Sequence, residues 1–236
     1  MPFMDNRMVR YGIVAWTLLI VSLVPLSGEG AQQNRYTVLI DPAHGGDDPG
    51  VVSDQIREKD LTMNIALLVR QEVQKGEGLQ VQLTRSADRT MTVAERIKAA
   101  SQLKPDCLIS LHINAGFGKK ATGYEVYFPG FRQELSPGGE AVPILKDMAK
   151  NKSLNDSVRL AQQIQAGVET VFPRKGRGLR DAPSPLLEGL TMPGLIVELG
   201  FATNPEERKR LTAEETQRAI ARALVKGLRN YFAKTP

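Results

Sequence analysis

The chain has 236 residues, of which only two are histidine and one is cysteine, and its formal net charge is +5 at pH 7. A single cysteine excludes a disulfide within the chain, so the fold must depend on its hydrophobic core. The positive charge is spread without a block of lysine and arginine, so we expect no nucleic-acid partner.

Residues 1–30 have the pattern of a signal peptide. Two arginines precede an apolar stretch over residues 11–26, and small residues follow it. The alternative is a retained membrane anchor, but the stretch is short for a span and a proline closes it. We expect cleavage near Gly30 or Ala31, a linker over residues 31–35, and export of the mature chain. Contact with a membrane is expected only through an uncleaved leader.

After the leader, short apolar runs alternate with helical patterns. The runs predict strands at residues 36–41, 79–84, 106–112, 123–128 and 195–199. Apolar residues at helical spacing predict helices whose stripes begin at Leu61, Val93, Leu160 and Ile220. This alternation predicts one α/β domain over residues 36–233, with an open, twisted, mostly parallel sheet of about six strands and helices on both faces.

Residues 131–155 interrupt this alternation. They contain a Ser-Pro-Gly-Gly stretch and then a modest amphipathic patch that includes Ile144 and Met148. The segment is longer than a connection between a strand and a helix requires. Two interpretations stay open: a solvated surface loop, or a lid or regulatory insertion over the active-site cleft.

Both histidines lie at or just beyond the ends of predicted strands. His44 follows the run at residues 36–41, and His112 ends the run at residues 106–112. Imidazole is the commonest metal ligand in proteins, and open α/β sheets place their sites at strand carboxyl ends. The two histidines therefore predict a metal site that needs at least one further ligand. Cys107 lies within the second run and is expected to be a buried thiol.

Two carboxylates are candidates to complete the site. Glu58 lies where the loop after the first strand turns into a helix, a position also typical of a glutamate that interacts favourably with the helix dipole. Glu198 is the only charge in the apolar run at residues 194–201, where burying it without a partner is costly. We interpret Glu198 as a catalytic base; the alternative is a buried ion pair with Arg85 or Arg180.

Other catalytic motifs are absent from the sequence. It has no Gly-x-Ser-x-Gly, no phosphate-binding loop and no His-Glu-x-x-His. Cys107 and His112 share one predicted strand five residues apart, which is a poor arrangement for a Cys/His pair. These absences argue against the usual schemes of nucleophilic catalysis and exclude an ordinary zincin protease on motif grounds.

Several motifs in order resemble the zinc-dependent N-acetylmuramoyl-L-alanine amidases of bacterial cell walls, from about Tyr36 to Phe232. The motifs are Ile40-Asp41-Pro42-Ala43-His44-Gly45-Gly46, Asp48-Pro49-Gly50, Glu58-Lys59-Asp60, Leu83-Thr84-Arg85, Ile109-Ser110-Leu111-His112-Ile113-Asn114-Ala115, Gly123-Tyr124-Glu125-Val126-Tyr127 and Val197-Glu198-Leu199-Gly200-Phe201. Ala43 departs from the glycine that is usual in the first motif, without touching a ligand.

The resemblance implies that His44, Glu58 and His112 bind one zinc ion and that Glu198 is the catalytic glutamate. It implies peptidoglycan as substrate and leaves room for an activator protein. It also implies that the exported protein acts in the periplasm, cell envelope or medium of a bacterium. Asn114 either binds the stem peptide or caps a loop. Some family members carry an insertion at the position of residues 131–155 that blocks the zinc, and the segment here is shorter.

The roles expected for three further polar residues come from their positions in the sequence and not from the resemblance. Asp41 either orients His44 or caps the following turn. Arg85 and Glu125 are expected to be structural or surface-facing rather than catalytic.

The implied reaction is hydrolysis of the amide between N-acetylmuramic acid and L-alanine, for wall remodelling, cell separation or recycling. The first alternative is another envelope zinc peptidase, such as a stem-peptide carboxypeptidase. The second is a catalytically silent wall-binding protein, which the presence of all four expected site residues argues against.

Overall fold

A computed structural model of the chain describes residues 36–54, 56–130, 144–172 and 178–234. The predicted leader and linker lie outside the described residues. The described residues all belong to one compact unit, Arg35–Pro236. Within it, no described helix is both long enough and apolar enough to cross a membrane.

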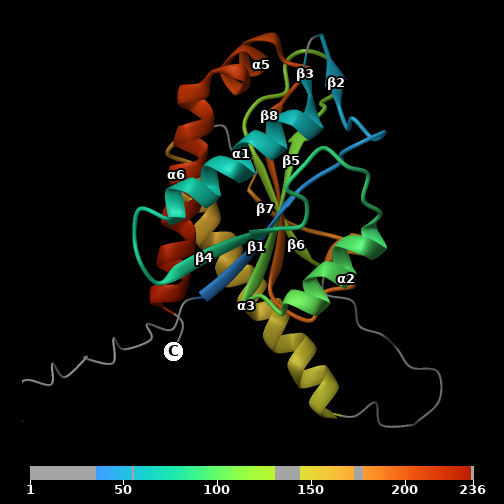
Figure 1. The fold of residues 1–236 in the computed structure, drawn as a ribbon, viewed down its shortest axis with the longest axis vertical. Coiled ribbons are helices and arrows are strands. Elements are labelled where there is room, and N and C mark those ends of the chain that lie inside the picture. The colour runs from blue at the N-terminus through green and yellow to red at the C-terminus, as the bar shows by residue number, and fades with distance from the viewer. Residues whose placement is uncertain (1–35, 55, 131–143, 173–177, 235–236) are drawn as a thin grey trace, which may run out of the picture. The chain divides into compact units, whose positions relative to one another are not determined.

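A six-stranded sheet forms the centre of this unit (Figure 1). Its strands are β1 (Tyr36–Pro42), β4 (Leu79–Leu83), β5 (Cys107–Asn114), β6 (Glu125–Pro129), β7 (Leu179–Ala182) and β8 (Gly194–Phe201). Their order is β4-β1-β5-β8-β6-β7, and every neighbouring pair is parallel except β6 with β8. A separate hairpin joins β2 (Val52–Ser53) and β3 (Ile56–Arg57). The predicted mostly parallel α/β sheet is confirmed.

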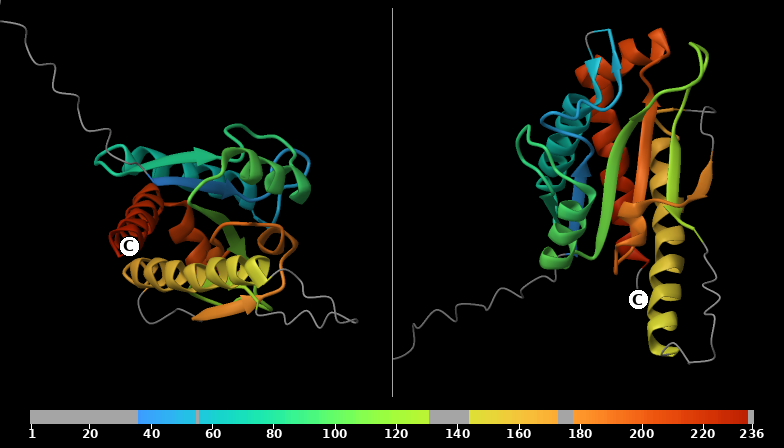
Figure 2. Two further views of the ribbon diagram at one scale, coloured as in Figure 1. Left: turned by 90° about the horizontal axis from the view of Figure 1, so that it is seen from below. Right: turned by 90° about the vertical axis from the view of Figure 1, so that its right-hand side faces the viewer.

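Helices cover both faces of the sheet (Figure 2). They are α1 (Glu58–Val73), α2 (Val93–Leu103), α3 (Ile144–Val168), α4 (Pro185–Glu188), α5 (Pro205–Thr212) and α6 (Glu214–Ala233). Alternate strand residues point to opposite faces. Val38 and Ile40 of β1 therefore belong to the same large buried cluster as residues of α1, α3 and α6, whereas Leu39 belongs to a smaller cluster with residues of α2 and α4.

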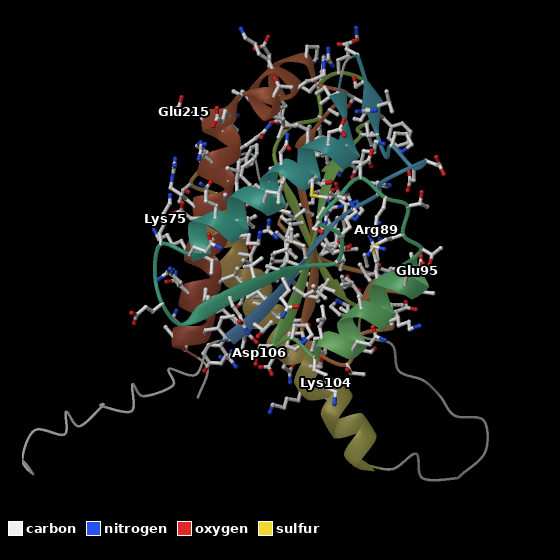
Figure 3. The ribbon with its side chains drawn as sticks, viewed as in Figure 1. Lys75, Arg89, Glu95, Lys104, Asp106 and Glu215 are labelled. Atoms are coloured by element: carbon white, nitrogen blue, oxygen red, sulfur yellow. The ribbon has the colours of Figure 1, made fainter. Side chains whose placement is uncertain are left out.

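The connection through α2 to β5 shows how local contacts fix element ends (Figure 3). Thr92 and Glu95 form a reciprocal capping box at the start of α2. Lys104 ends the helix with a left-handed backbone, at φ 46°. Asp106 then accepts a hydrogen bond from the Thr37 backbone at 2.7 Å, which ties the start of β5 to β1.

The main departure from the predicted elements concerns α3. This helix begins at Ile144 and continues to Val168, so residues 144–155 form its first part rather than a loop. The long run of polar residues after Met148 gives only a weak apolar stripe, which explains why the sequence pattern missed it. The rest of the proposed lid, residues 131–143, lies outside the described part of the chain.

Candidate active site

The loop after β1 presents His44 at the carboxyl end of the sheet. His44 has a left-handed backbone with φ 60°, which is uncommon for a residue with a side chain. Arg96 Nη2 donates to the His44 carbonyl at 2.8 Å, and Arg85 Nη2 donates to the carbonyl of Ala43 at 2.9 Å. Both arginines are buried. The backbone that carries His44 is therefore held from outside the loop, and Arg85 is structural, as expected.

Asp41 does neither of the two things expected of it. Its Oδ1 accepts from Thr84 and Arg96, both at 2.5 Å, and its Oδ2 accepts from Ser110 at 2.7 Å. The expectation that Asp41 orients the His44 ring is therefore wrong. It acts one step away, because the arginine that it binds also holds the His44 carbonyl.

Asp48 is the carboxylate that meets the His44 ring. Its Oδ2 lies 2.7 Å from His44 Nδ1, and its Oδ1 accepts from the Gly50 backbone at 3.0 Å. The hydrogen bond to His44 lowers the pKa of Asp48. Sequence reasoning missed this contact, although Asp48 follows His44 by four residues in a glycine-rich loop.

Glu58 is the first residue of α1 and lies between the two histidines. Its carboxylate is 3.2 Å from His44 Nε2 and 3.1 Å from His112 Nδ1. The backbone amides of Val51 and Ile113 donate to the same carboxylate at 2.8 and 3.0 Å. Burial alone would raise the pKa of Glu58, but the hydrogen bonds hold it well below its usual range.

These three residues form a group that could hold a metal ion. Their candidate ligand atoms all lie within 4.8 Å of one another. Two imidazoles and one carboxylate are a recurrent donor set for catalytic zinc, which keeps a further position open. Hydrogen bonding to Glu58 raises the pKa of His44 to about 9, with burial opposing and Asp48 adding to the shift. In the metal-free protein a proton on His44 thus supplies positive charge beside Glu58.

Gly50 leaves the space that this arrangement requires. It has φ 65°, and a Cβ at this position would lie 2.5 Å from Glu58 Oε2 and 2.6 Å from His44 Cδ2. No real Cβ approaches other atoms so closely without displacing them. The glycine therefore allows the loop backbone to pass directly against two of the candidate ligands.

Glu198 lies beside this group on the neighbouring strand. It is opposite His112 in the parallel pair β5–β8, so both side chains share one face of the sheet. Its Oε2 is buried and finds no hydrogen-bond partner among the described residues. Burial, with the nearby charges of Glu58 and Glu125, raises the pKa of Glu198 to about 7, while both histidines oppose the shift.

The alternative of a buried ion pair does not account for Glu198. Arg85 donates to backbone carbonyls in the loop after β1 and in α1. The Arg180 guanidinium lies 3.9 Å from Glu125 Oε1 instead. Within the described residues, Glu198 is thus a partly buried carboxylate without an arginine partner.

Two further polar residues reach this region from β6. Glu125 is buried, and its backbone is opposite Glu198 in the antiparallel pair β6–β8. Of the two roles expected for Glu125, structural or surface-facing, the surface-facing one is therefore wrong. Its Oε2 accepts from Asn114 Nδ2 at 2.8 Å and from the Tyr127 hydroxyl at 2.7 Å. Asn114 ends β5 and is therefore fixed by Glu125 rather than by a loop cap. Their proximity depends on strand order, which no local sequence signal revealed.

Known proteins with similar sequences cover almost the whole of the described domain. The family model described as N-acetylmuramoyl-L-alanine amidase matches residues 38–230. The uncharacterized protein YqiI of Bacillus subtilis (strain 168) is 30% identical over 214 residues, which cover 91% of this chain and 93% of that protein. The amidase AmiC of Escherichia coli O6:H1 is 22% identical over 89% of this chain, which spans only 56% of that relative.

A solved structure shares the fold described above. The N-acetylmuramoyl-L-alanine amidase from Clostridium difficile 630 superposes with a TM-score of 0.73 at 30% sequence identity. The match covers 86% of this chain and 100% of that one. The similarity therefore extends over most of this chain and the whole of that one.

Proposed function

This chain belongs to the N-acetylmuramoyl-L-alanine amidase family, and from that premise we propose that His44, Glu58 and His112 hold one zinc ion and that Glu198 is the catalytic base. The observation that carries the proposal is a partly buried carboxylate, whose Oε2 is buried without a hydrogen-bond partner among the described residues, on the strand next to a preformed His/Glu/His group. A carboxylate kept partly protonated near neutral pH can accept and return a proton.

The reaction is hydrolysis of the amide bond between N-acetylmuramic acid and L-alanine in peptidoglycan. The family match favours this activity over a stem-peptide carboxypeptidase. A silent wall-binding protein is also disfavoured, because the chain retains every candidate ligand and Glu198.

The donor set fits zinc in both number and type. Glu58 and His112 are fixed by backbone or side-chain contacts before any metal binds, and Asp48 holds the remaining nitrogen of His44. When bound, zinc supplies Lewis acidity, which polarises the scissile carbonyl and acidifies water. The residues of this chain supply the ligand geometry and the proton transfers.

Glu198 would act on the attacking water. As a carboxylate it takes the proton from the water that attacks the amide carbon. As the carbon–nitrogen bond breaks, it returns that proton to the nitrogen of L-alanine, which leaves as an amine. Burial raises the pKa of Glu198 in the metal-free site, which favours its action as a base.

Export follows from where the substrate lies. Peptidoglycan lies outside the cytoplasmic membrane, so we propose that residues 1–30, which are not described structurally, direct secretion. The activator protein stays a prediction of the family resemblance, and so does a gating role for residues 131–155.

Product analysis of purified peptidoglycan tests the proposed reaction. The amidase should release intact stem peptides with a free L-alanine amino group and leave glycan strands bare. A carboxypeptidase would release single amino acids and leave the peptides attached. Recovery of amino acids alone would contradict the proposal. Addition of a zinc chelator should stop peptide release, and restored zinc should recover it.

A further inference from the structure

Next to Glu198, three side chains form a hydrogen-bonded group that the proposed reaction does not use. We call Asn114, Glu125 and Tyr127 the Glu125 cluster. Glu125 is its hub, because one carboxylate oxygen accepts from both other members. Neither zinc binding by His44, Glu58 and His112 nor proton transfer by Glu198 requires these hydrogen bonds.

The strand arrangement places the cluster beside the reacting groups. Across β5, β8 and β6, His112 is opposite Glu198, and Glu198 is opposite Glu125. These residues therefore form one row on one face of the sheet. Tyr127 lies two residues beyond Glu125 and shares that face. Because β6 runs antiparallel to β8, its first residues reach the edge where β5 and β8 end.

Glu125 determines how the other two side chains can bond. Glu125 Oε2 is the acceptor in both bonds, so the Asn114 amide turns its nitrogen toward it. The Asn114 oxygen is then directed away from Glu125 as an acceptor. The Tyr127 hydroxyl likewise gives its proton to Glu125, which leaves its oxygen as an acceptor. Burial and the bond to Glu125 raise the pKa of Tyr127 to about 12, so the phenol keeps that proton.

A positive charge supports the carboxylate from its other side. Arg180 of β7 lies 3.9 Å from Glu125 Oε1, and half of its side chain is exposed. It pairs with Tyr127 across the parallel strands β6 and β7. Arg180 therefore lies near Glu125 Oε1, while Oε2 keeps its bonds to Asn114 and Tyr127.

We propose that Glu125 is a positioning residue that orients Asn114 and Tyr127 as a pair of acceptors for backbone N–H groups of the stem peptide. The inference rests on the proposed function, since it takes Glu198 as the base and the peptide as the substrate. The stem peptide carries amide N–H donors on both sides of its first residue. Acceptors beside Glu198 would hold these donors while the scissile carbonyl faces the metal ligands.

A purely structural role is the competing explanation. A buried glutamate that accepts two hydrogen bonds also stabilises a sheet, and its loss lowers stability whatever its function. Glu207 provides the matched control. It is buried as well, and it accepts from the backbone amides of Gly123 and Phe201 at 2.9 and 3.0 Å.

The test measures kcat and KM of zinc-loaded variants on a soluble N-acetylmuramoyl peptide. Asn114→Ala and Glu125→Gln should each lower kcat/KM about tenfold, mainly through KM, as expected for lost substrate hydrogen bonds. The double variant should lose little more than either single one, because both act as one unit. Tyr127→Phe should show a smaller rise in KM. Glu207→Gln should lower the melting temperature while KM stays at the wild-type value.

Two results would overturn the inference. One is a KM within about twofold of wild type for both Asn114→Ala and Glu125→Gln. The other is a lower melting temperature in these variants with KM at the wild-type value, as expected for Glu207→Gln. If Glu125→Gln does not fold, Asn114→Ala and Tyr127→Phe carry the same test. Glu198→Gln in the same assay distinguishes a failure of this inference from a failure of the proposed function. An active Glu198→Gln variant would overturn the proposed function itself.

Discussion

Glu198 lies directly opposite His112 across the parallel strands β5 and β8, and both side chains share one face of the sheet. Through His112, which is 3.1 Å from Glu58, this pairing places Glu198 next to the candidate metal ligands. The two strands thus bring together a proposed base and a proposed ligand that are 86 residues apart in sequence (198 − 112).

Activity should fall on the acid side of neutrality. Glu198 must be ionised to accept a proton, and its pKa is raised from 4.5 to about 7 in the metal-free site. Bound zinc adds positive charge and lowers that value, so the acid limb of kcat/KM should have its midpoint between these two pH values. Activity is present above the midpoint and is lost as pH falls through it. The profile should be measured with zinc content checked at each pH, and activity that rises toward pH 5 would contradict it.

Zinc binding should release protons at neutral pH. His44 has its pKa raised to about 9 in the metal-free protein, chiefly by its hydrogen bond to Glu58, so it carries a proton at pH 7.5. A metal ligand must be deprotonated, so zinc affinity should rise with pH up to about 9. Calorimetry in buffers of different ionisation enthalpy counts the protons released. A value near zero at pH 7.5 would show that His44 is not a ligand or is already neutral.

Gly50→Ala should damage the metal site. The new Cβ would lie 2.5 Å from Glu58 Oε2, so the ligand must move. Gly78→Ala is the matched control, because Gly78 also has positive φ, 82°, with nothing within 4 Å of an added Cβ. Both variants should lose about 1 kcal/mol of stability from backbone strain. Only Gly50→Ala should lose zinc and activity; equal zinc content in the two proteins would refute the close approach.

Asp48→Asn should weaken zinc binding without abolishing it. The carboxylate holds His44 Nδ1 at 2.7 Å, which fixes the ring and leaves Nε2 for the metal. Loss of such a partner typically costs about 10- to 100-fold in metal affinity. The neighbouring exposed Asp47→Asn makes the same charge change next to the site and should leave affinity within about twofold. Competition with a zinc-binding dye measures the zinc affinity of each variant. Equal affinities for Asp48→Asn and Asp47→Asn would show that Asp48 does not support zinc binding.

Much of the sheet was predictable because buried parallel strands read as short apolar runs. The five predicted strands all occur, with β5 and β8 extending two residues beyond their expected ends. The short edge strand β7 escaped notice, since two of its four residues are charged and its burial is only partial. The early start of α3 was missed for the related reason that its apolar stripe is weak.

The site was only partly visible in the sequence. Glu198 stood out as a lone charge in an apolar run, and both histidines marked strand ends. Glu58 looked like an ordinary helix-start glutamate, and only the family resemblance favoured a ligand role. The contacts of Glu125 with Asn114 and Tyr127 depend on β6 lying antiparallel beside β8, which is a property of strand order.

The most direct test of the proposed site is Glu198→Gln, measured for zinc content and for release of stem peptide from purified peptidoglycan. The substitution keeps the side chain's shape and removes its ability to accept a proton. The proposed roles predict stoichiometric zinc with peptide release reduced at least about 1,000-fold, since base and acid functions are lost together. Full zinc content with peptide release near the wild-type rate would contradict the assignment of Glu198 as the catalytic base.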